Sequence, residues 1–231
     1  MAAGGSTRKS CSPLATRAPA ASSSIRRRTR LVGLLAFARK RGLWLIADEV
    51  YGRIVYGNRA ARSFLEQSEA EDRVIVVNSF SKAWAMTGWR LGWMTLPPAL
   101  LPEIEKLVEF NTSGAPTFLQ RAAIVAIHEG EDFVESSVAR FQAARDVAID
   151  GLRSCRRVAV ARPEGAFYAF LRVDGLADSV AFAKELLHTA KVGLAPGAAF
   201  GPMGEGWLRM CFARDPASIA EAVERLRPAL S

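Results

Sequence analysis

The chain has 231 residues, of which 50% are hydrophobic and 23% charged, and its formal net charge is +8. This length can bury one sizeable core or two small ones, while no apolar run approaches the ~20 residues of a membrane-spanning helix. Three cysteines without a CxxC pattern argue against a disulfide framework or a zinc site, and they favour reduced thiols in a cytoplasm. Two histidines without an HExxH motif leave little material for metal chemistry.

The positive charge is concentrated at the start of the chain. Residues 1–47 hold ten Lys and Arg and no acid, whereas the remaining residues hold 21 Lys and Arg against 23 Asp and Glu. Residues 1–30 are rich in Ala, Ser, Gly, Pro and Arg without apolar periodicity, which predicts a disordered segment. A transit peptide or a nucleic-acid-binding arm are alternatives. Since a solvated basic tail is the more frequent case, we expect no nucleic-acid partner.

From residue 31 the hydrophobic pattern predicts regular elements. Helical spacing, with basic ends or Gly and Pro as stops, predicts helices at 31–41, 98–111, 116–129 and 131–154. Short apolar runs predict strands at 43–47, 73–78 and 91–96, the first of them buried on both faces. Buried strands that alternate with helices indicate an α/β fold.

After the long helix at 131–154 the pattern of predicted strands and helices changes, which indicates a smaller α+β unit. Its strands are expected at 166–172, 191–195 and 207–212, and its helices at 179–189 and 216–228. No internal repeat is evident.

The most informative stretch runs from Val74 to Met94. An apolar run ends in Ser79-Phe80-Ser81-Lys82, and Arg90 follows eight residues after the lysine. This grouping suits a phosphorylated aldehyde such as pyridoxal phosphate, because the amine can form a Schiff base while hydroxyls and a guanidinium bind the phosphate. The alternative is a solvated lysine in a turn. Several aromatic residues near the lysine argue against this alternative, namely Phe80, Trp84, Trp89 and Trp93.

Asp48 directly follows the first predicted strand, where open α/β sheets place their ligands. From this position alone, a capping role is an equal alternative. Its functional interpretation is that a fixed carboxylate keeps the ring nitrogen of pyridoxal phosphate protonated. Tyr51 could donate its phenol to the cofactor's ring oxygen, or it could simply pack.

Arg209 lies within the apolar strand Trp207 to Phe212. A charge in such a strand is costly without an anion beside it. The anion could be an internal carboxylate or the α-carboxylate of an amino-acid substrate, and the other candidate residues favour the substrate.

Five motifs carry a family resemblance: DEVYG at 48–52, SFSKAWAMTGWRLGW at 79–93, PEGAFY at 163–168, PGAAFG at 196–201 and LRMCFA at 208–213. In this order and spacing they resemble class I/II aminotransferases, which are fold-type I pyridoxal-phosphate enzymes related to aspartate aminotransferase. The resemblance spans residues 31–231. It implies a partial, mostly parallel large domain over 31–140, a small α+β domain over 141–231 and a homodimer.

The same resemblance implies a role for each candidate residue. Lys82 would carry the cofactor and shuttle a proton, Asp48 would bind the pyridine nitrogen and Tyr51 the ring oxygen. The phosphate would be held by Ser79, Ser81 and Arg90, and Arg209 would hold the substrate carboxylate. The implied reaction is transfer of an amino group from an amino acid to a 2-oxo acid in two half-reactions.

The motifs of the family's first half are not found before residue 31, where an NPTG turn would be expected and APAASSSIRRRTR stands instead. We therefore expect an N-terminally truncated or frame-shifted chain that binds pyridoxal phosphate weakly and turns over little. A carbon–sulfur lyase of the same fold is the nearest alternative function. A non-catalytic sensor domain attached to a DNA-binding module ranks behind it.

Overall fold

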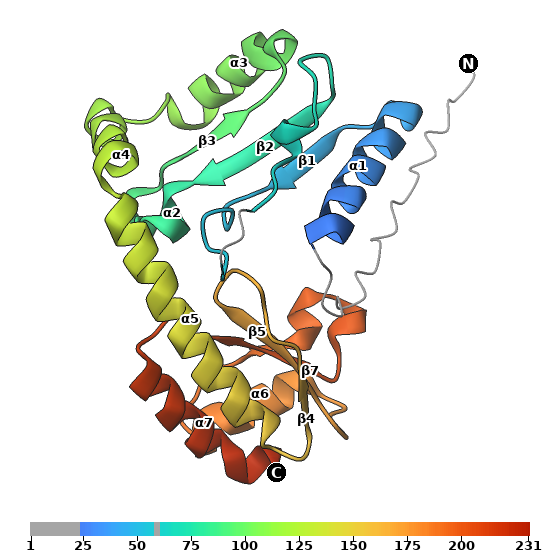
Figure 1. Cartoon of the computed structure of the whole chain (residues 1–231), viewed down its shortest axis with the longest axis vertical. Helices are drawn as coiled ribbons and strands as arrows, with labels where there is room; N and C mark the ends of the chain where they lie inside the picture. The colour runs from blue at the N-terminus through green and yellow to red at the C-terminus, as the bar shows by residue number, and fades with distance from the viewer. Residues whose placement is uncertain (1–23, 58–60) are drawn as a thin grey trace, which may run out of the picture.

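The computed structural model describes residues 24–57 and 61–231, with side chains from Leu31 onward. Two parts are joined by the long helix α5 (Glu131–Arg153), as Figure 1 shows. One part holds a three-stranded sheet with α1 to α4, and the other holds a four-stranded sheet with α6 and α7. The predicted α/β fold is confirmed. No helix among the described residues is long and apolar enough to cross a bilayer.

Helix α1 (Ser24–Arg41) begins earlier than predicted. Residues 24–30, which we assigned to the disordered segment, form its first turns, whereas residues 1–23 of that segment lie outside the described residues. The reason is that arginine is a good helix former and that extending a helix is far easier than nucleating one. The helix ends as expected, with Arg39 to Arg41 in its last turn and Gly42 following at a φ of +60°.

The first sheet has the order β1-β2-β3. Strands β1 (Leu45–Asp48) and β2 (Val74–Ser79) run parallel, as expected, while β3 (Gly92–Thr95) pairs antiparallel with β2. The expected parallel pairing therefore holds for β1 and β2, and β3 is an antiparallel addition to it. The chain between β2 and β3 forms only short helical turns near the end of β2. A third strand parallel to β2 would need a longer connection that crosses the face of the sheet.

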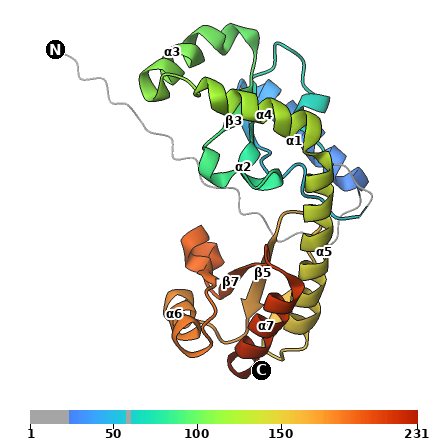
Figure 2. The ribbon, with the colours of Figure 1, turned by 90° about the vertical axis from the view of Figure 1, so that its left-hand side faces the viewer.

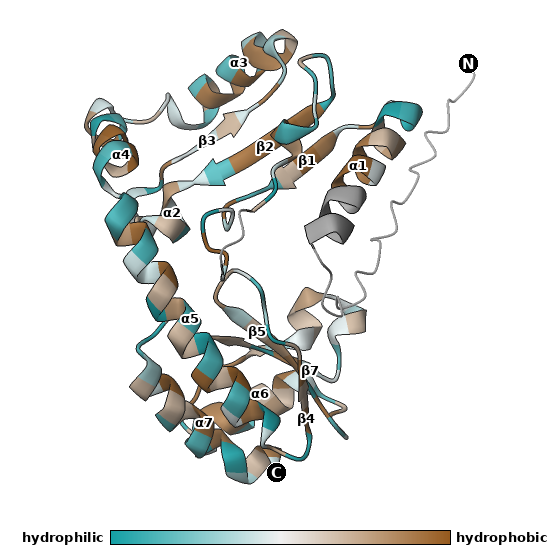
Figure 3. Ribbon diagram, in the orientation of Figure 1, coloured by the Kyte–Doolittle hydropathy of each residue, from teal (hydrophilic) through white to brown (hydrophobic). Residues whose placement is uncertain are grey.

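Only one face of this sheet is covered by described residues. Leu35 of α1 packs there with Ala47, Val74 and Val76. On the opposite face Ile46 is 69% exposed, so the prediction that this strand is buried on both faces is wrong. Successive strand residues point to opposite faces, and no described element covers the second one. Figure 3 shows hydrophobic residues along β2 and on α3.

Helices α3 (Leu101–Thr112) and α4 (Thr117–Glu129) follow β3 close to the predicted positions. Both expose large apolar side chains, among which Phe110 is 88% and Phe118 68% exposed. The short helical elements of the chain are α2 (Phe80–Ala83), η1 (Phe64–Glu66), η2 (Thr87–Trp89), η3 (Pro98–Leu100), η4 (Gly197–Phe200) and η5 (Pro202–Gly204).

The second sheet is antiparallel in all its pairings, in the order β4-β5-β7-β6. Its strands are β4 (Val158–Val160), β5 (Tyr168–Val173), β6 (Ala195–Pro196) and β7 (Trp207–Cys211). Strand β4 was not predicted, because three residues between arginines carry little periodicity. One sheet face packs on α5 and on α7 (Pro216–Leu230), which lie side by side (Figure 2), and α6 (Ser179–Thr189) adds to the same core.

The chain after β1 crosses into this second core. Ile54 and Tyr56 are buried there although they belong to the part that we assigned to the large domain. Val55 forms a β-bridge with Gly165, and a Cβ on that glycine would lie 2.8 Å from the carbonyl oxygen of Ile54. A glycine at this point therefore allows the two parts of the chain to approach closely.

Candidate functional site

The candidate site lies at one edge of the first sheet, where the parallel strands end. Asp48 is the last residue of β1 and is paired with Val77, two residues before Ser79 at the end of β2. The structure therefore brings Asp48 and Ser79 to the same edge, the place where α/β sheets bind ligands.

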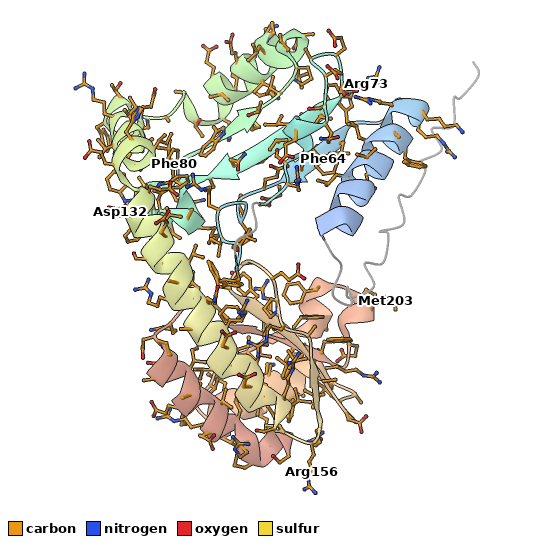
Figure 4. All side chains as sticks on the ribbon, viewed as in Figure 1. Phe64, Arg73, Phe80, Asp132, Arg156 and Met203 are labelled. Carbon is orange, nitrogen blue, oxygen red and sulfur yellow. The ribbon has the colours of Figure 1, made fainter. Side chains whose placement is uncertain are left out.

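Lys82 lies in the single turn of α2, directly after β2. Phe80 anchors this turn, because it packs in a small core with Leu91 and Ala123. Figure 4 shows Phe80 between the edge of the first sheet and the start of α5. Ser79 caps the turn, since its hydroxyl accepts the N–H of Ser81 at 3.0 Å. The side chain of Lys82 is half-buried, and its Nζ lies 6.0 Å from the centre of the Tyr51 ring.

Among the described residues, none of the aromatic side chains expected around Lys82 places its ring over the amine. The ring centres of Trp84 and Trp93 each lie 5.1 Å from that of Phe80, and Trp89 is 44% exposed. The ring beside the amine is that of Tyr51, which the sequence placed in a different motif.

Arg90 stands just before β3, in the left-handed region at a φ of 52°. Its Nη1 donates to the carbonyl oxygen of Thr87 at 2.8 Å. The carbonyl of the next residue, Leu91, accepts the hydroxyl of Ser79 at 3.3 Å, so the Arg90 backbone is held next to the end of β2. Ser79, Lys82 and Arg90 are thus neighbours in space as well as in sequence.

Two of the candidate residues also have local roles. Asp48 is exposed, and its Oδ1 accepts the N–H of Val50 at 3.2 Å. The Ser79 hydroxyl is already engaged by Ser81 and Leu91. The capping alternative that the sequence left open for Asp48 is therefore present, and its second carboxylate oxygen has no hydrogen bond to a described residue.

Tyr51 connects this edge to the second sheet. Its hydroxyl donates to the hydroxyl of Tyr168 at 3.3 Å, and its ring lies edge-on to Phe167 at 5.4 Å. Burial, followed by the hydrogen bond with Tyr168, raises the pKa of the Tyr51 phenol above its ordinary value. The phenol therefore stays protonated and is able to donate at neutral pH.

Arg209 lies on the open face of the second sheet, beside Tyr168 of the neighbouring strand. Its guanidinium carbon is 4.4 Å from the centre of the Tyr168 ring and 4.5 Å from that of Phe200. It is half-buried and forms no ion pair with any carboxylate in 31–57 or 61–231. Rings that flank a guanidinium leave its N–H groups available to an anion.

A cleft of about 550 Å³ opens beside the site. Asp48, Tyr51 and Ser79 line one part of it, and Trp84 and Trp93 line another. This volume is in the range of small-molecule sites. Lys82, Ser81 and Arg90 are not part of its lining and stand next to it.

Sequence reasoning did not single out Tyr168 or Phe200, the two rings beside Arg209. Both occur in quoted motifs, as the last residue of PEGAFY and within PGAAFG. Strand pairing of β5 with β7 could have suggested Tyr168, because it stands opposite Cys211 and diagonal to Arg209.

The family model for aminotransferases of class I and II matches residues 24–226. The chain belongs to this family. The match begins seven residues before Leu31, where we expected the resemblance to start, and it coincides with the observed start of α1.

This aminotransferase-family chain is 35% identical over 205 residues to the aspartate aminotransferase of Thermotoga maritima, covering 89% of the chain and 52% of that protein. It is 34% identical over 191 residues to an aspartate aminotransferase of Pyrococcus horikoshii, covering 81% of the chain and 48% of that protein. Among solved structures, the aromatic aminotransferase of Pyrococcus horikoshii superposes with a TM-score of 0.83 at 32% identity, over 88% of this chain and 55% of that one. The chain thus spans about half the length of the relatives that it matches.

Proposed function

We propose that the chain takes part in pyridoxal-phosphate-dependent transfer of an amino group from an amino acid to a 2-oxo acid. The observation that carries this proposal is the position of Lys82, half-buried over the Tyr51 ring at the carboxyl edge of β1 and β2. A lysine held in this way beside a ligand edge is suited to capture an aldehyde.

The residues present fit the cofactor by their chemistry. Lys82, Arg90 and Arg209 form no ion pair with a carboxylate of the described residues, so three cations are available to anionic groups. Asp48 keeps an oxygen free for a protonated ring nitrogen, and Tyr51 is a neutral donor. Phosphate, pyridinium and phenolate oxygen each find a matching partner in this set.

In the proposed mechanism each residue has one task. Pyridoxal phosphate, when bound, supplies the electron sink that makes the substrate α-proton removable. Lys82 would hold the cofactor through its amine and, once that amine is free, would take up the proton as a general base and return it as an acid. Arg209 binds and orients the substrate α-carboxylate. Ser79, Ser81 and Arg90 would hold the phosphate, and Asp48 and Tyr51 would contact the ring.

We further propose that the protein acts in a cytoplasm as a homodimer. Cys155 is buried and Cys211 exposed, and both are free thiols, which supports a reducing compartment. Exposed apolar residues on α3 and α4, Phe110 and Phe118 among them, support an assembled form. Sedimentation equilibrium of the purified chain tests the dimer.

The experiment for the function is covalent trapping. The purified chain is mixed with pyridoxal phosphate, its absorbance is recorded, and the mixture is reduced with borohydride and mapped by peptide mass. The expected result is a modified peptide that contains Lys82. A label spread over exposed lysines such as Lys106 in proportion to their exposure contradicts the proposal. Product analysis with amino and 2-oxo acids then separates transamination, which conserves the amine, from elimination, which releases ammonia.

A further inference from the structure

Tyr168 contacts Tyr51 at one end of the proposed site and Arg209 at the other. Its hydroxyl accepts the hydrogen bond from Tyr51, whose ring lies under Lys82. Its ring lies against the guanidinium of Arg209. A tyrosine at the start of β5 thus joins the edge of the first sheet to the open face of the second.

The ring of Tyr168 has a distinct role from its hydroxyl. With Phe200 it flanks the Arg209 guanidinium, and both centroid distances are within 4.5 Å. Since these rings restrict the rotamers of a long side chain, they fix where its N–H groups point. No described carboxylate performs this task for Arg209.

The hydroxyl acts on the other side. Tyr51 has Tyr168 as its hydrogen-bond partner, and the two rings are 6.0 Å apart at 80°. Each of the two hydroxyls can turn its single proton. When Tyr51 donates to the cofactor's ring oxygen, the Tyr168 hydroxyl would donate to the Tyr51 oxygen in turn, so removing it would leave the half-buried Tyr51 phenol without its partner.

We propose that Tyr168 is a positioning residue that aligns Tyr51 through its hydroxyl and Arg209 through its ring, and so couples cofactor binding to binding of the substrate carboxylate. The inference rests on the proposed function for the identity of the two ligands. It adds a residue to which neither the motifs nor the cofactor contacts assign a role.

Two substitutions separate the two roles. Tyr168→Phe removes the hydroxyl and keeps the ring, so pyridoxal phosphate, measured by absorbance titration, should bind about five-fold more weakly. The rate at which phenylglyoxal modifies Arg209, followed by peptide mapping, should stay as in the wild type. Tyr168→Leu removes the ring as well, and it should raise that modification rate about three-fold or more.

Tyr56→Phe is the matched control. Tyr56 also joins the two parts of the chain, since its hydroxyl donates to the carbonyl oxygen of Ala166 and its ring lies 4.5 Å from the guanidinium carbon of Arg145. It touches neither Lys82 nor Arg209. This variant should alter stability while it leaves cofactor affinity and Arg209 modification unchanged, and far-UV circular dichroism checks that every variant is folded.

The outcomes distinguish this inference from the proposed function. If the wild type does not bind pyridoxal phosphate, the function fails, but the phenylglyoxal rates of the two Tyr168 variants still decide the role of the ring. Wild-type cofactor affinity in Tyr168→Phe overturns the role of the hydroxyl. An unchanged Arg209 rate in Tyr168→Leu overturns that of the ring, and an equal loss in Tyr56→Phe shows that both effects are structural only.

Discussion

The amine of Lys82 lies 6.0 Å from the centre of the Tyr51 ring, although the two residues belong to different motifs and to connections that follow different strands. The contact arises because β1 and β2 are parallel neighbours and their carboxyl ends meet at one edge. The candidate site is therefore a consequence of the sheet pairing.

Lys82→Ala should abolish borohydride-dependent incorporation of pyridoxal phosphate at the site. Lys106→Ala is the control, because Lys106 is exposed on α3 and pairs only loosely with Glu103 at 3.8 Å. Its loss should leave the label at Lys82 unchanged. Mass mapping of the reduced proteins measures both, and persistent stoichiometric labelling of the Lys82→Ala variant would show that another amine is the nucleophile.

Arg90→Gly should stabilise the unliganded chain and weaken cofactor binding. A non-glycine residue at a φ of 52° carries strain that glycine relieves, which we expect to add up to about 1 kcal/mol to the free energy of unfolding. Loss of the guanidinium removes charged hydrogen bonds to phosphate, so affinity should fall roughly ten-fold or more. Urea unfolding with and without pyridoxal phosphate measures both effects, and a parallel change in the two would contradict this account.

Gly165→Ala should destabilise the fold by about 1–3 kcal/mol, because its Cβ would lie 2.8 Å from the carbonyl oxygen of Ile54. Gly33→Ala is the matched control within α1, where nothing lies within 4 Å of an added Cβ. That substitution should stabilise by about 0.5–1 kcal/mol, since alanine is the better helix former. Urea midpoints compare the two, and equal shifts would exclude a close approach at Gly165.

Truncating a buried side chain of the second core should cost more stability than truncating an exposed side chain of similar hydrophobicity. Leu152 of α5 is fully buried, and Leu152→Ala should cost about 2–5 kcal/mol through lost contacts and a cavity. Ile46→Ala on the open face of the first sheet should change stability by less than about 0.5 kcal/mol. Chemical denaturation of both variants gives these differences. A large loss for Ile46→Ala would mean that this face is covered in solution.

Lowering the pH should reduce the free energy of unfolding of the second part of the chain through protonation of Glu205. The N–H groups of Ser179 and Gly206 donate to its carboxylate and hold the pKa of Glu205 below its ordinary value. The folded state therefore binds fewer protons than the unfolded state, so this contribution is present above the unfolded pKa of about 4.3 and is lost as the pH falls below it. Glu205→Gln should be less stable than the wild type at pH 7, and this difference in thermal melting should shrink as the pH is lowered towards 3. A constant difference between these pH values would rule out this linkage.

Local sequence was sufficient for much of this protein. Short apolar runs, Gly42 and the basic end of α1 located most helices and strands, because these signals act within a few residues. The grouping of Ser79, Lys82 and Arg90 was readable for the same reason, since one turn and one short connection hold all three.

Tertiary structure alone decided the rest. The antiparallel β3, the open face of Ile46, the contact of Tyr51 with Tyr168 and the rings beside Arg209 all depend on which distant segments pack together. Periodicity reports which side of an element is apolar, but it carries no information on what covers that side. That is why the sequence predicted the elements and the candidate lysine, whereas packing determined how the two parts of the candidate site meet.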